Sequence, residues 1–362
     1  MVSPLFAADP PRIYADGVNH LYSLDFAEAE DAFRSLTRDY PDNPDYWNAL
    51  ASSYWLKILY NQQKLNMESF SGKDRFGTTE SKDSGSEAEE KQLRETVDKA
   101  LVAADALLKK NPKDINAIYA KGASYATLAT FEATIRRAWL SAARKAKTAR
   151  NYHKDVLKLD PNFSDARASV GIYNYAVGSL SWGARFLVSI VGLGGEGKQV
   201  GIADLETAAA KGTRSAVDAK MVLVVVYGRE QQYDKALKMI DELHAKYPRN
   251  FMLDMTKASI YGKMKRWDLA VRTYRQMAEK VAAHQDGYER LRVEKVYYEL
   301  ANCEFQAQQF EDASRAYARV TDGANSTPNE KATAHLWMGR ISDTSNNRPD
   351  ALKHYNAILT LD

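Results

Sequence analysis

The sequence lacks the features that mark disulfide-stapled, membrane-spanning or strongly charged proteins. Cys303 is the single cysteine among 362 residues, which excludes an intramolecular disulfide and a cysteine-rich zinc site but leaves the redox compartment open. No stretch approaches the roughly 18 consecutive apolar residues of a membrane-spanning helix. Fifty Lys and Arg residues against 47 Asp and Glu residues leave a net charge of +3, so a nucleic-acid or anionic-membrane role would need a local basic patch.

Recognisable catalytic motifs are also missing from the sequence. The six histidines are scattered and form no HExxH or other close metal-binding pair, and no GxSxG nucleophile elbow occurs. Cys303 lies in the segment Leu300-Ala-Asn-Cys-Glu-Phe305, where a small packed side chain is a better interpretation than a nucleophile. We therefore predict that the protein is not an enzyme and that it has no catalytic residues, no metal site and no cofactor.

The composition is that of a folded protein too long for one ordinary core. Hydrophobic residues make up 45% and charged residues 27% of the chain, which is a globular balance. At 362 residues, the chain requires either several domains or a repeat array that grows without a single centre.

The main positive feature is an internal repeat of about 34 residues. An alanine is followed by a bulky residue 4 positions later and by a proline 12 positions later, as in Ala29, Phe33 and Pro41 and again in Ala236, Ile240 and Pro248. A second signature, W-x2-L-G-x2-Y, appears as Trp47, Leu50, Ala51 and Tyr54, with alanine in place of glycine. The repeat predicts an all-α fold of stacked helix pairs.

Aligned on these positions, the repeat covers almost the whole chain. Eight units begin near residues 10, 44, 115, 164, 217, 251, 294 and 332. We expect a small residue where the first helix of a pair meets the second, and glycine fills this position at Gly17, Gly122, Gly171 and Gly339. We expect the bulky second-helix residues, such as Phe33 and Tyr355, to pack on the following unit. The segment Thr327-Pro-Asn-Glu330 predicts a helix start with a capping box.

Three consecutive units are longer than the repeat requires. From Pro41 to Pro112 the spacing exceeds one repeat by 37 residues, and from Pro112 to Pro161 it exceeds one repeat by 15. The unit that begins at 164 has about 19 additional residues relative to the usual repeat. The first excess contains a long polar insertion at 61–91, and the second is the length of about two added turns on each of two paired helices.

The chain therefore divides into four predicted parts. Residues 1–9 form a flexible N-terminus or the remnant of an export signal, because Val2–Ala8 resembles the end of a signal peptide without its basic and long apolar parts. Residues 10–114 hold units 1 and 2, residues 115–216 hold the enlarged units 3 and 4, and residues 217–362 hold the regular units 5 to 8. We expect an exported, periplasmic protein, and a cytoplasmic location stays open.

The segment Gly192-Leu-Gly-Gly-Glu-Gly-Lys198 fits the phosphate-loop pattern GxxxxGK. The pattern then requires Ser or Thr to hold magnesium, and Gln199 stands there instead. We interpret the segment as a glycine-rich turn that links two helices, and we predict no nucleotide site.

A basic segment runs from Arg136 to Lys154 without an acidic residue. On a helix most of its cations share one face, and Trp139 and Ala142 fall on the opposite side. This basic face could bind an acidic peptide or an anionic membrane surface, or it could be a solvated face that pairs with carboxylates elsewhere. Aromatic residues are sparse here, so nucleic acid is not expected. The basic face comprises Arg136, Arg137, Arg144, Lys147, Arg150 and Lys154.

Through these Trp/Leu/Tyr and Ala/aromatic/Pro positions, the chain resembles the tetratricopeptide-repeat family from residue 10 to 362, and more loosely its exported bacterial members. The resemblance implies a right-handed α-solenoid of about eight units, three of them enlarged here. It also implies a concave groove, lined by first helices, that binds a protein or peptide for complex assembly. The enlarged units interrupt the pattern between residues 57 and 216, and the sequence leaves the ligand and oligomeric state open. The implied groove residues are Tyr14, Asn48, Trp55, Tyr119, Tyr175, Arg229, Lys263, Tyr298, Asn302 and Arg340.

Overall fold

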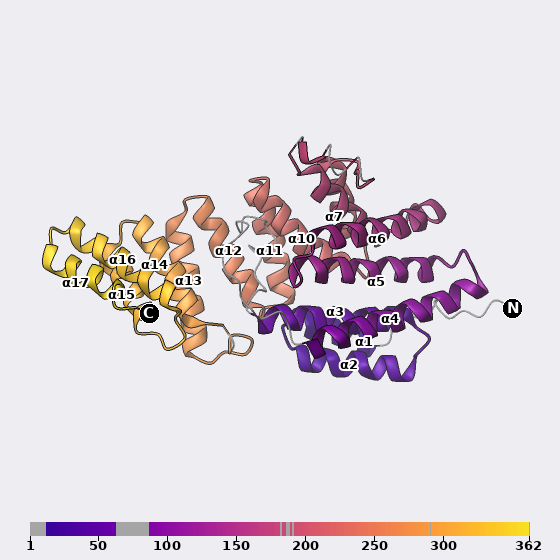
Figure 1. Cartoon of the computed structure of the whole chain (residues 1–362), viewed down its shortest axis with the longest axis horizontal. Helices are drawn as coiled ribbons and strands as arrows, with labels where there is room; N and C mark the ends of the chain where they lie inside the picture. The colour runs from indigo at the N-terminus through magenta and orange to yellow at the C-terminus, as the bar shows by residue number, and fades with distance from the viewer. Residues whose placement is uncertain are drawn as a thin grey trace. The chain divides into compact units, whose positions relative to one another are not determined.

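Every regular element in the described part of the chain is an α-helix. The computed structural model describes residues 12–62, 87–181, 183–185, 189, 192–289 and 291–361, and no strand occurs among them. The helices form two compact units, called unit 1 (residues 1–239) and unit 2 (residues 240–362) below and distinct from the eight predicted repeat units. Figure 1 shows the helices in chain order. The prediction of an all-α solenoid is confirmed.

Unit 1 contains the first nine described helices, and consecutive helices in it contact one another. Each first helix packs on its partner in the pairs α1/α2, α3/α4, α5/α6 and α7/α9, and α2/α3, α4/α5 and α6/α7 join successive pairs. The helices are α1 (Arg12–Tyr22), α2 (Phe26–Asp39), α3 (Pro44–Asn61), α4 (Glu87–Lys110), α5 (Ile115–Thr134), α6 (Trp139–Leu159), α7 (Ala166–Gly178), α9 (Lys198–Lys211) and α10 (Ala216–Arg229).

The next helix, α11 (Tyr233–Lys246), includes the boundary between the two units. In unit 2 the pairs α12/α13, α14/α15 and α16/α17 pack in series, joined by α13/α14 and α15/α16 contacts. Its helices are α12 (Phe251–Lys263), α13 (Trp267–Ala282), α14 (Val293–Gln306), α15 (Phe310–Thr321), α16 (Pro328–Thr344) and α17 (Arg348–Ile358).

Much of the additional length of the enlarged repeat units lies in longer helices. Helices α5 and α6 contain 20 and 21 residues, against 14 in α10 and 14 in α11, so each is longer by nearly two turns, as expected. The predicted insertion at 61–91 is shorter than we expected, because α3 extends to Asn61 and α4 begins at Glu87. Glu87, Glu89 and Glu90 favour a helix start through their interaction with the helix dipole. The rest of the insertion, residues 63–86, lies outside the described residues.

Glycine at the small position of the first helix is required by close contact with the second helix. A Cβ atom on Gly17 would lie 2.8 Å from the Phe33 ring, and one on Gly171 would lie 2.7 Å from the carbonyl oxygen of Gly201. At Gly339 the obstacle is the ring of Tyr355. Phe33 and Tyr355 therefore pack back onto the first helix of their own pair, a contact that we had assigned to the following unit.

The predicted capping box at the start of α16 is present in full. The Thr327 hydroxyl accepts a hydrogen bond from the Glu330 N–H at 3.2 Å, and the Glu330 carboxylate accepts one from the Thr327 N–H at 2.8 Å. Pro328 occupies the first helical position, where its missing N–H costs nothing.

Thr327→Ala should lower the free energy of unfolding of unit 2 by about 1 kcal/mol, because it removes an N-terminal cap. Urea denaturation of the full chain, followed by hydrogen exchange of α16 peptides, measures the effect. Thr333→Ala is a matched control in the interior of the same helix and should change stability by less than about 0.5 kcal/mol. Equal effects of the two substitutions would contradict a role for the cap.

Candidate functional site

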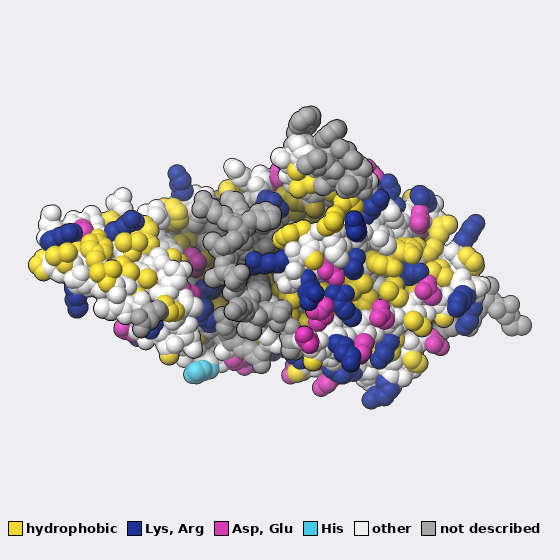
Figure 2. All heavy atoms as spheres, in the orientation of Figure 1, with side chains coloured by type: hydrophobic (Ala, Val, Ile, Leu, Met, Phe, Trp, Pro, Cys, Tyr) yellow, Lys and Arg dark blue, Asp and Glu magenta, His cyan; other side chains and the backbone are white. Residues whose placement is uncertain are grey.

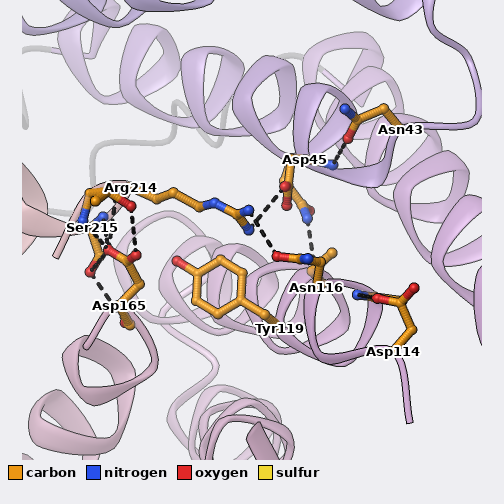
Figure 3. A network of polar contacts seen from close by, with 12 residues as sticks. Asn43, Asp45, Asp114, Asn116, Tyr119, Asp165, Arg214 and Ser215 are labelled. Carbon is orange, nitrogen blue, oxygen red and sulfur yellow. Dashed lines mark hydrogen bonds and ion pairs between the residues drawn. The ribbon is translucent and has the colours of Figure 1, made fainter. Parts of the chain in front are cut away.

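The most elaborate polar cluster in unit 1 joins the starts of four first helices. Figure 3 shows its centre, the guanidinium group of Arg214, in the turn before α10. Its Nη1 lies 3.0 Å from the Asp45 carboxylate at the start of α3, and its Nη2 donates to Asn116 Oδ1 of α5 at 2.9 Å. The guanidinium also lies over the Tyr119 ring, 5.3 Å from the centroid. We call these residues, with Asp165 and Ser215, the Arg214 cluster.

Asp165, at the start of α7, holds the turn that carries Arg214. Its Oδ1 accepts backbone N–H groups of Thr213, Arg214 and Ser215 at 2.9, 2.8 and 2.9 Å. The hydroxyls of Thr213 and Ser215 each donate to the same carboxylate at 3.0 Å. Asp165 is buried, so these charge-assisted bonds replace the water that the carboxylate loses.

Helix capping places the other members of the cluster. Asn43 accepts a hydrogen bond from the Asp45 N–H at 3.0 Å, and Asp114 accepts one from the Ala117 N–H at 3.0 Å. These caps fix where α3 and α5 begin. They therefore fix the positions of Asp45 and Asn116, the two partners of Arg214, on the first turns of their helices.

The cluster connects segments that are far apart in the sequence. Asp45 and Arg214 belong to the second and fifth helix pairs, and Tyr22 of α1 donates to Asp218 of α10 at 2.5 Å. The first helices of unit 1 therefore approach one another closely enough for direct contact.

Burial and charge act in opposite directions on the cluster. Burial raises the pKa of the Asp45 carboxyl, and Arg214 opposes that rise. For Arg214, desolvation works against the charged form, but Asp45 and neighbouring groups raise the pKa above its usual value. The paired charges hold helices together, and the cluster contains neither a cysteine nor a histidine that could act as a nucleophile or general base.

The predicted groove residues fall into three classes of exposure. Asn48, Tyr119 and Tyr175 are buried, and in this structure they support the first helices instead of presenting a contact surface. Asn48, for example, donates to the carbonyl oxygen of Ala120 at 2.9 Å. Tyr14, Trp55, Tyr298 and Asn302 are partly buried, and Arg229, Lys263 and Arg340 are exposed. Ligand contact by any of the ten residues stays a prediction.

Sequence reasoning missed Arg214, Asp165 and Asn116. The only sequence signal was an arginine in the short turn Gly212-Thr-Arg-Ser215 before a first helix. A charged residue in a turn is ordinarily solvated, and nothing in a single sequence indicates that α3 and α5 approach it.

Half of the basic face is paired with carboxylates, through Arg136, Arg150 and Lys154. Among the described residues, Arg137, Arg144 and Lys147 have no ion-pair partner. Trp139 is 58% exposed, although we expected it on the packed side; α6 begins only at Trp139, so this side chain in the first turn is not covered. Figure 2 shows basic and acidic side chains interspersed over the visible face of unit 1. The ion pairs are Arg136–Glu90 at 3.0 Å, Lys145–Glu132 at 3.7 Å, Arg150–Glu196 at 2.7 Å and Lys154–Glu196 at 2.6 Å.

The glycine-rich segment precedes a helix, as a phosphate loop does, but its lysine is engaged elsewhere. Gly197, with φ of +104°, stands immediately before α9, and the conformation favours glycine. The Lys198 ammonium lies 2.6 Å from the Glu230 carboxylate. The apolar run before the turn, residues 186–191, lies mostly outside the described residues.

The described residues contain neither a candidate metal cluster nor a helix that could span a membrane. No group of three or more His, Cys, Asp or Glu side chains there could hold a metal ion. Among the same residues, no helix combines the length and apolar character needed to cross a membrane.

Comparisons with known proteins bear on the fold. Residues 14–57 match the family model described as tetratricopeptide repeat, and no curated protein sequence matches the chain. The solved structure of yeast Tom70 is similar at 14% identity, over 99% of this chain and 86% of Tom70, with a TM-score of 0.37. PilW, a widely conserved type IV pilus biogenesis factor, is similar at 15% identity over 66% of this chain and 91% of PilW, with a TM-score of 0.41. A tetratricopeptide repeat protein from Parabacteroides merdae is similar at 15% identity over 90% of this chain and 98% of that protein, with a TM-score of 0.32.

The chain is a helical-repeat protein built from pairs of helices packed in series. Its first pair and the first helix of its second, residues 14–57, match a tetratricopeptide repeat.

Proposed function

We propose that the chain is a non-enzymatic scaffold that binds a protein or peptide through the exposed surface of its first helices during complex assembly. Tetratricopeptide-repeat proteins generally mediate protein–protein interaction. The observation that carries the proposal is a pair of exposed arginines in the C-terminal halves of first helices, each lying over an aromatic ring. Arg229 lies 5.9 Å from the Tyr175 ring centroid in unit 1, and Arg340 lies 4.7 Å from that of Trp337 in unit 2.

These arginines have properties that binding surfaces use. A guanidinium stacked on an aromatic ring loses fewer conformations when it binds a partner, so less of the interaction energy is spent on ordering. Arginine and aromatic residues also dominate the binding energy of protein interfaces. The positive charge of Arg229 and Arg340 favours a partner that presents carboxylates at the contact.

Affinity purification with the full chain, followed by quantitative binding of each recovered partner, tests the proposal. Arg229→Glu or Arg340→Glu should weaken the Kd of the relevant partner at least about tenfold, as loss of a charged anchor does. The matched control is Lys238→Glu on α11, a second helix, where the exposed lysine should tolerate reversal. Equal weakening by all three variants, or no weakening by either arginine variant, would contradict the proposal.

The second candidate function is docking of the basic face, residues 136–154, on an anionic membrane. The exposed Trp139 and Leu140, 58% and 54% exposed, lie beside the unpaired Arg137 and favour this function, because tryptophan and arginine suit the membrane interface. The ion pairs of Arg136, Arg150 and Lys154 weigh against it. Sedimentation with phosphatidylserine vesicles that Trp139→Ala and Arg137→Glu abolish would support docking, and absence of sedimentation would eliminate it. Export to the periplasm stays a proposal, because residues 1–9 lie outside the described residues.

A further inference from the structure

The basic face of α6 and the glycine-rich turn play no part in the proposed scaffold function. The two features meet in unit 1. Along α6, Lys147, Arg150 and Lys154 are spaced by three and four residues, so they share one face of the helix. Arg150 and Lys154 contact Glu196 of the glycine-rich turn at 2.7 and 2.6 Å. A Cβ atom on Gly192, at the start of the turn, would lie 3.3 Å from the Lys147 ammonium. The basic face of α6 therefore lies against the turn formed by residues 192–197.

Positive charge exceeds negative charge at this contact. Arg150 and Lys154 bind the same oxygen, Oε1 of Glu196, and Lys147 has no ion-pair partner among the described residues. The hydrogen bond from Lys154 lowers the pKa of the Glu196 carboxyl, so Glu196 is ionised at neutral pH. The Glu196 carboxylate thus contacts two cations, and the third, Lys147, lies beside Gly192 of the same turn.

A buried amide beside the turn has a donor without an acceptor. Asn174 of α7 is fully buried, and its Oδ1 accepts a hydrogen bond from the Glu196 N–H at 3.1 Å. This bond holds the amide group at the turn, and its Nδ2 has no hydrogen-bond partner among the described residues. The Nε of Arg150 is likewise buried without a partner. Buried donors in this state are rare, because each costs free energy unless an acceptor is supplied.

The turn leads directly into α9, a helix of 14 residues. Among the described residues no side chain caps this helix at Gly197, and its first residue packs on α7, where a Cβ atom on Gly178 would lie 2.3 Å from the Lys198 backbone nitrogen. A Cβ atom on Gly194 would meet none of the described residues within 4 Å, which leaves room among them beside the turn. The cations of α6 and the amide of Asn174 therefore converge on the turn 192–197.

We propose that α6 and the turn 192–197 bind a phosphate group, and that Glu196 is an internal anion that occupies the cations when no ligand is bound. A phosphate group offers more acceptor oxygens than a carboxylate and can accept from Lys147, Arg150 and Lys154 together. Lys198 is held by Glu230, so this site differs from a nucleotide-hydrolysing phosphate loop and requires no reaction. The phosphate can belong to a small metabolite or to a lipid head group, and the inference does not depend on the proposed scaffold function.

Isothermal titration of the full chain with inorganic phosphate and pyrophosphate, at constant ionic strength, tests the site. Glu196→Gln removes the internal competitor and should tighten binding about tenfold, the effect of roughly 1.4 kcal/mol. Lys147→Ala should weaken binding about tenfold for the same reason in reverse. Lys158→Ala is the matched control on α6, since Lys158 is exposed and pairs with Asp155, and it should leave the affinity unchanged. Circular dichroism confirms that each variant keeps its helices.

Parallel sedimentation with phosphatidylglycerol and phosphatidylcholine vesicles distinguishes the two sources of phosphate. Binding of free phosphate or pyrophosphate that responds to Glu196→Gln and Lys147→Ala supports a soluble ligand. Binding only to phosphatidylglycerol vesicles, with the same response, supports a lipid head group. No binding to any probe, or binding that Lys147→Ala and Lys158→Ala weaken equally, would overturn the proposal.

Discussion

Asp165→Ala should lower the free energy of unfolding of unit 1 by about 3–5 kcal/mol, the range expected when a buried charge network loses one partner. The substitution leaves the N–H groups of residues 213–215 without their acceptor. It also frees the turn that holds Arg214 over Tyr119. Hydrogen exchange of peptides covering residues 205–229, combined with urea denaturation of the full chain, measures the loss.

Two further variants separate the hydrogen bonds from general disturbance. Asp165→Asn keeps one acceptor oxygen for the three N–H groups, so it should cost less than alanine, about 1–2 kcal/mol. Asp155→Ala removes an exposed carboxylate of α6 whose partner is Lys158, and its effect should stay within about 0.5 kcal/mol. If Asp165→Ala behaved like Asp155→Ala, the Arg214 cluster would not stabilise unit 1.

Acidification from pH 7 to pH 4 should weaken unit 1 through the buried His153. This ring of α6 lies where a Cβ atom on Gly122 would be. Its Nε2 lies 3.0 Å from the Tyr119 carbonyl oxygen, which can only accept, so Nε2 carries the proton. Nδ1 then accepts from the Ser169 hydroxyl. Both nitrogens are satisfied only in the neutral ring, and burial lowers the pKa of His153 from 6.5 to about 4.

The direction of the change in stability with pH follows from proton binding by the folded and unfolded chains. Unfolded chains bind a proton at His153 below pH 6.5, but the folded chain binds it only near pH 4. The stabilisation is therefore complete above pH 6.5 and is lost as the pH falls towards 4. At about 1.36 kcal/mol per pKa unit, the full effect is about 3 kcal/mol.

Comparison of the wild type with His153→Gln isolates this contribution from those of other acidic and basic groups. Urea midpoints at several pH values between 7 and 4, read from hydrogen exchange of α5 and α6, should fall more steeply in the wild type. The variant should lose stability at pH 7 and show a flatter profile. Parallel profiles in the two proteins would contradict the assignment of the proton to His153.

The helix pairs could be predicted from the sequence because the spacing of the repeat reflects contacts between neighbouring helices. Gly17 and Phe33 are close in sequence and belong to one pair, so a fixed spacing reports their contact. Gly122 was likewise recognised as a small position, but the ring that fills the space, His153, could not be assigned. The extra length of α5 and α6 brings His153 opposite Gly122. The spacing between these two residues therefore differs from that in the regular repeat units.

The candidate site depended on contacts that spacing does not record. Asp45 and Arg214 meet only because the successive helix pairs of unit 1 bring α3 towards the turn before α10. This arrangement is set by packing across several helix pairs. Asn48 occupies a first-helix position that suggested a groove, but α5 covers it. Trp139 was misplaced because the chain turns at Arg137, which has φ of +52°, and the helix that we expected to span residues 136–154 begins three residues later.

The most direct test of the account is site-specific photo-cross-linking in extract of the source organism. A photoreactive amino acid is placed at position 229 or 340, on first helices, and at position 238, on a second helix. The account predicts that a defined polypeptide is cross-linked at 229 or 340 and not at 238, and that excess unlabelled chain competes it away. Cross-linking at 238 alone, or the same set of adducts at all three positions, would contradict binding through the first helices.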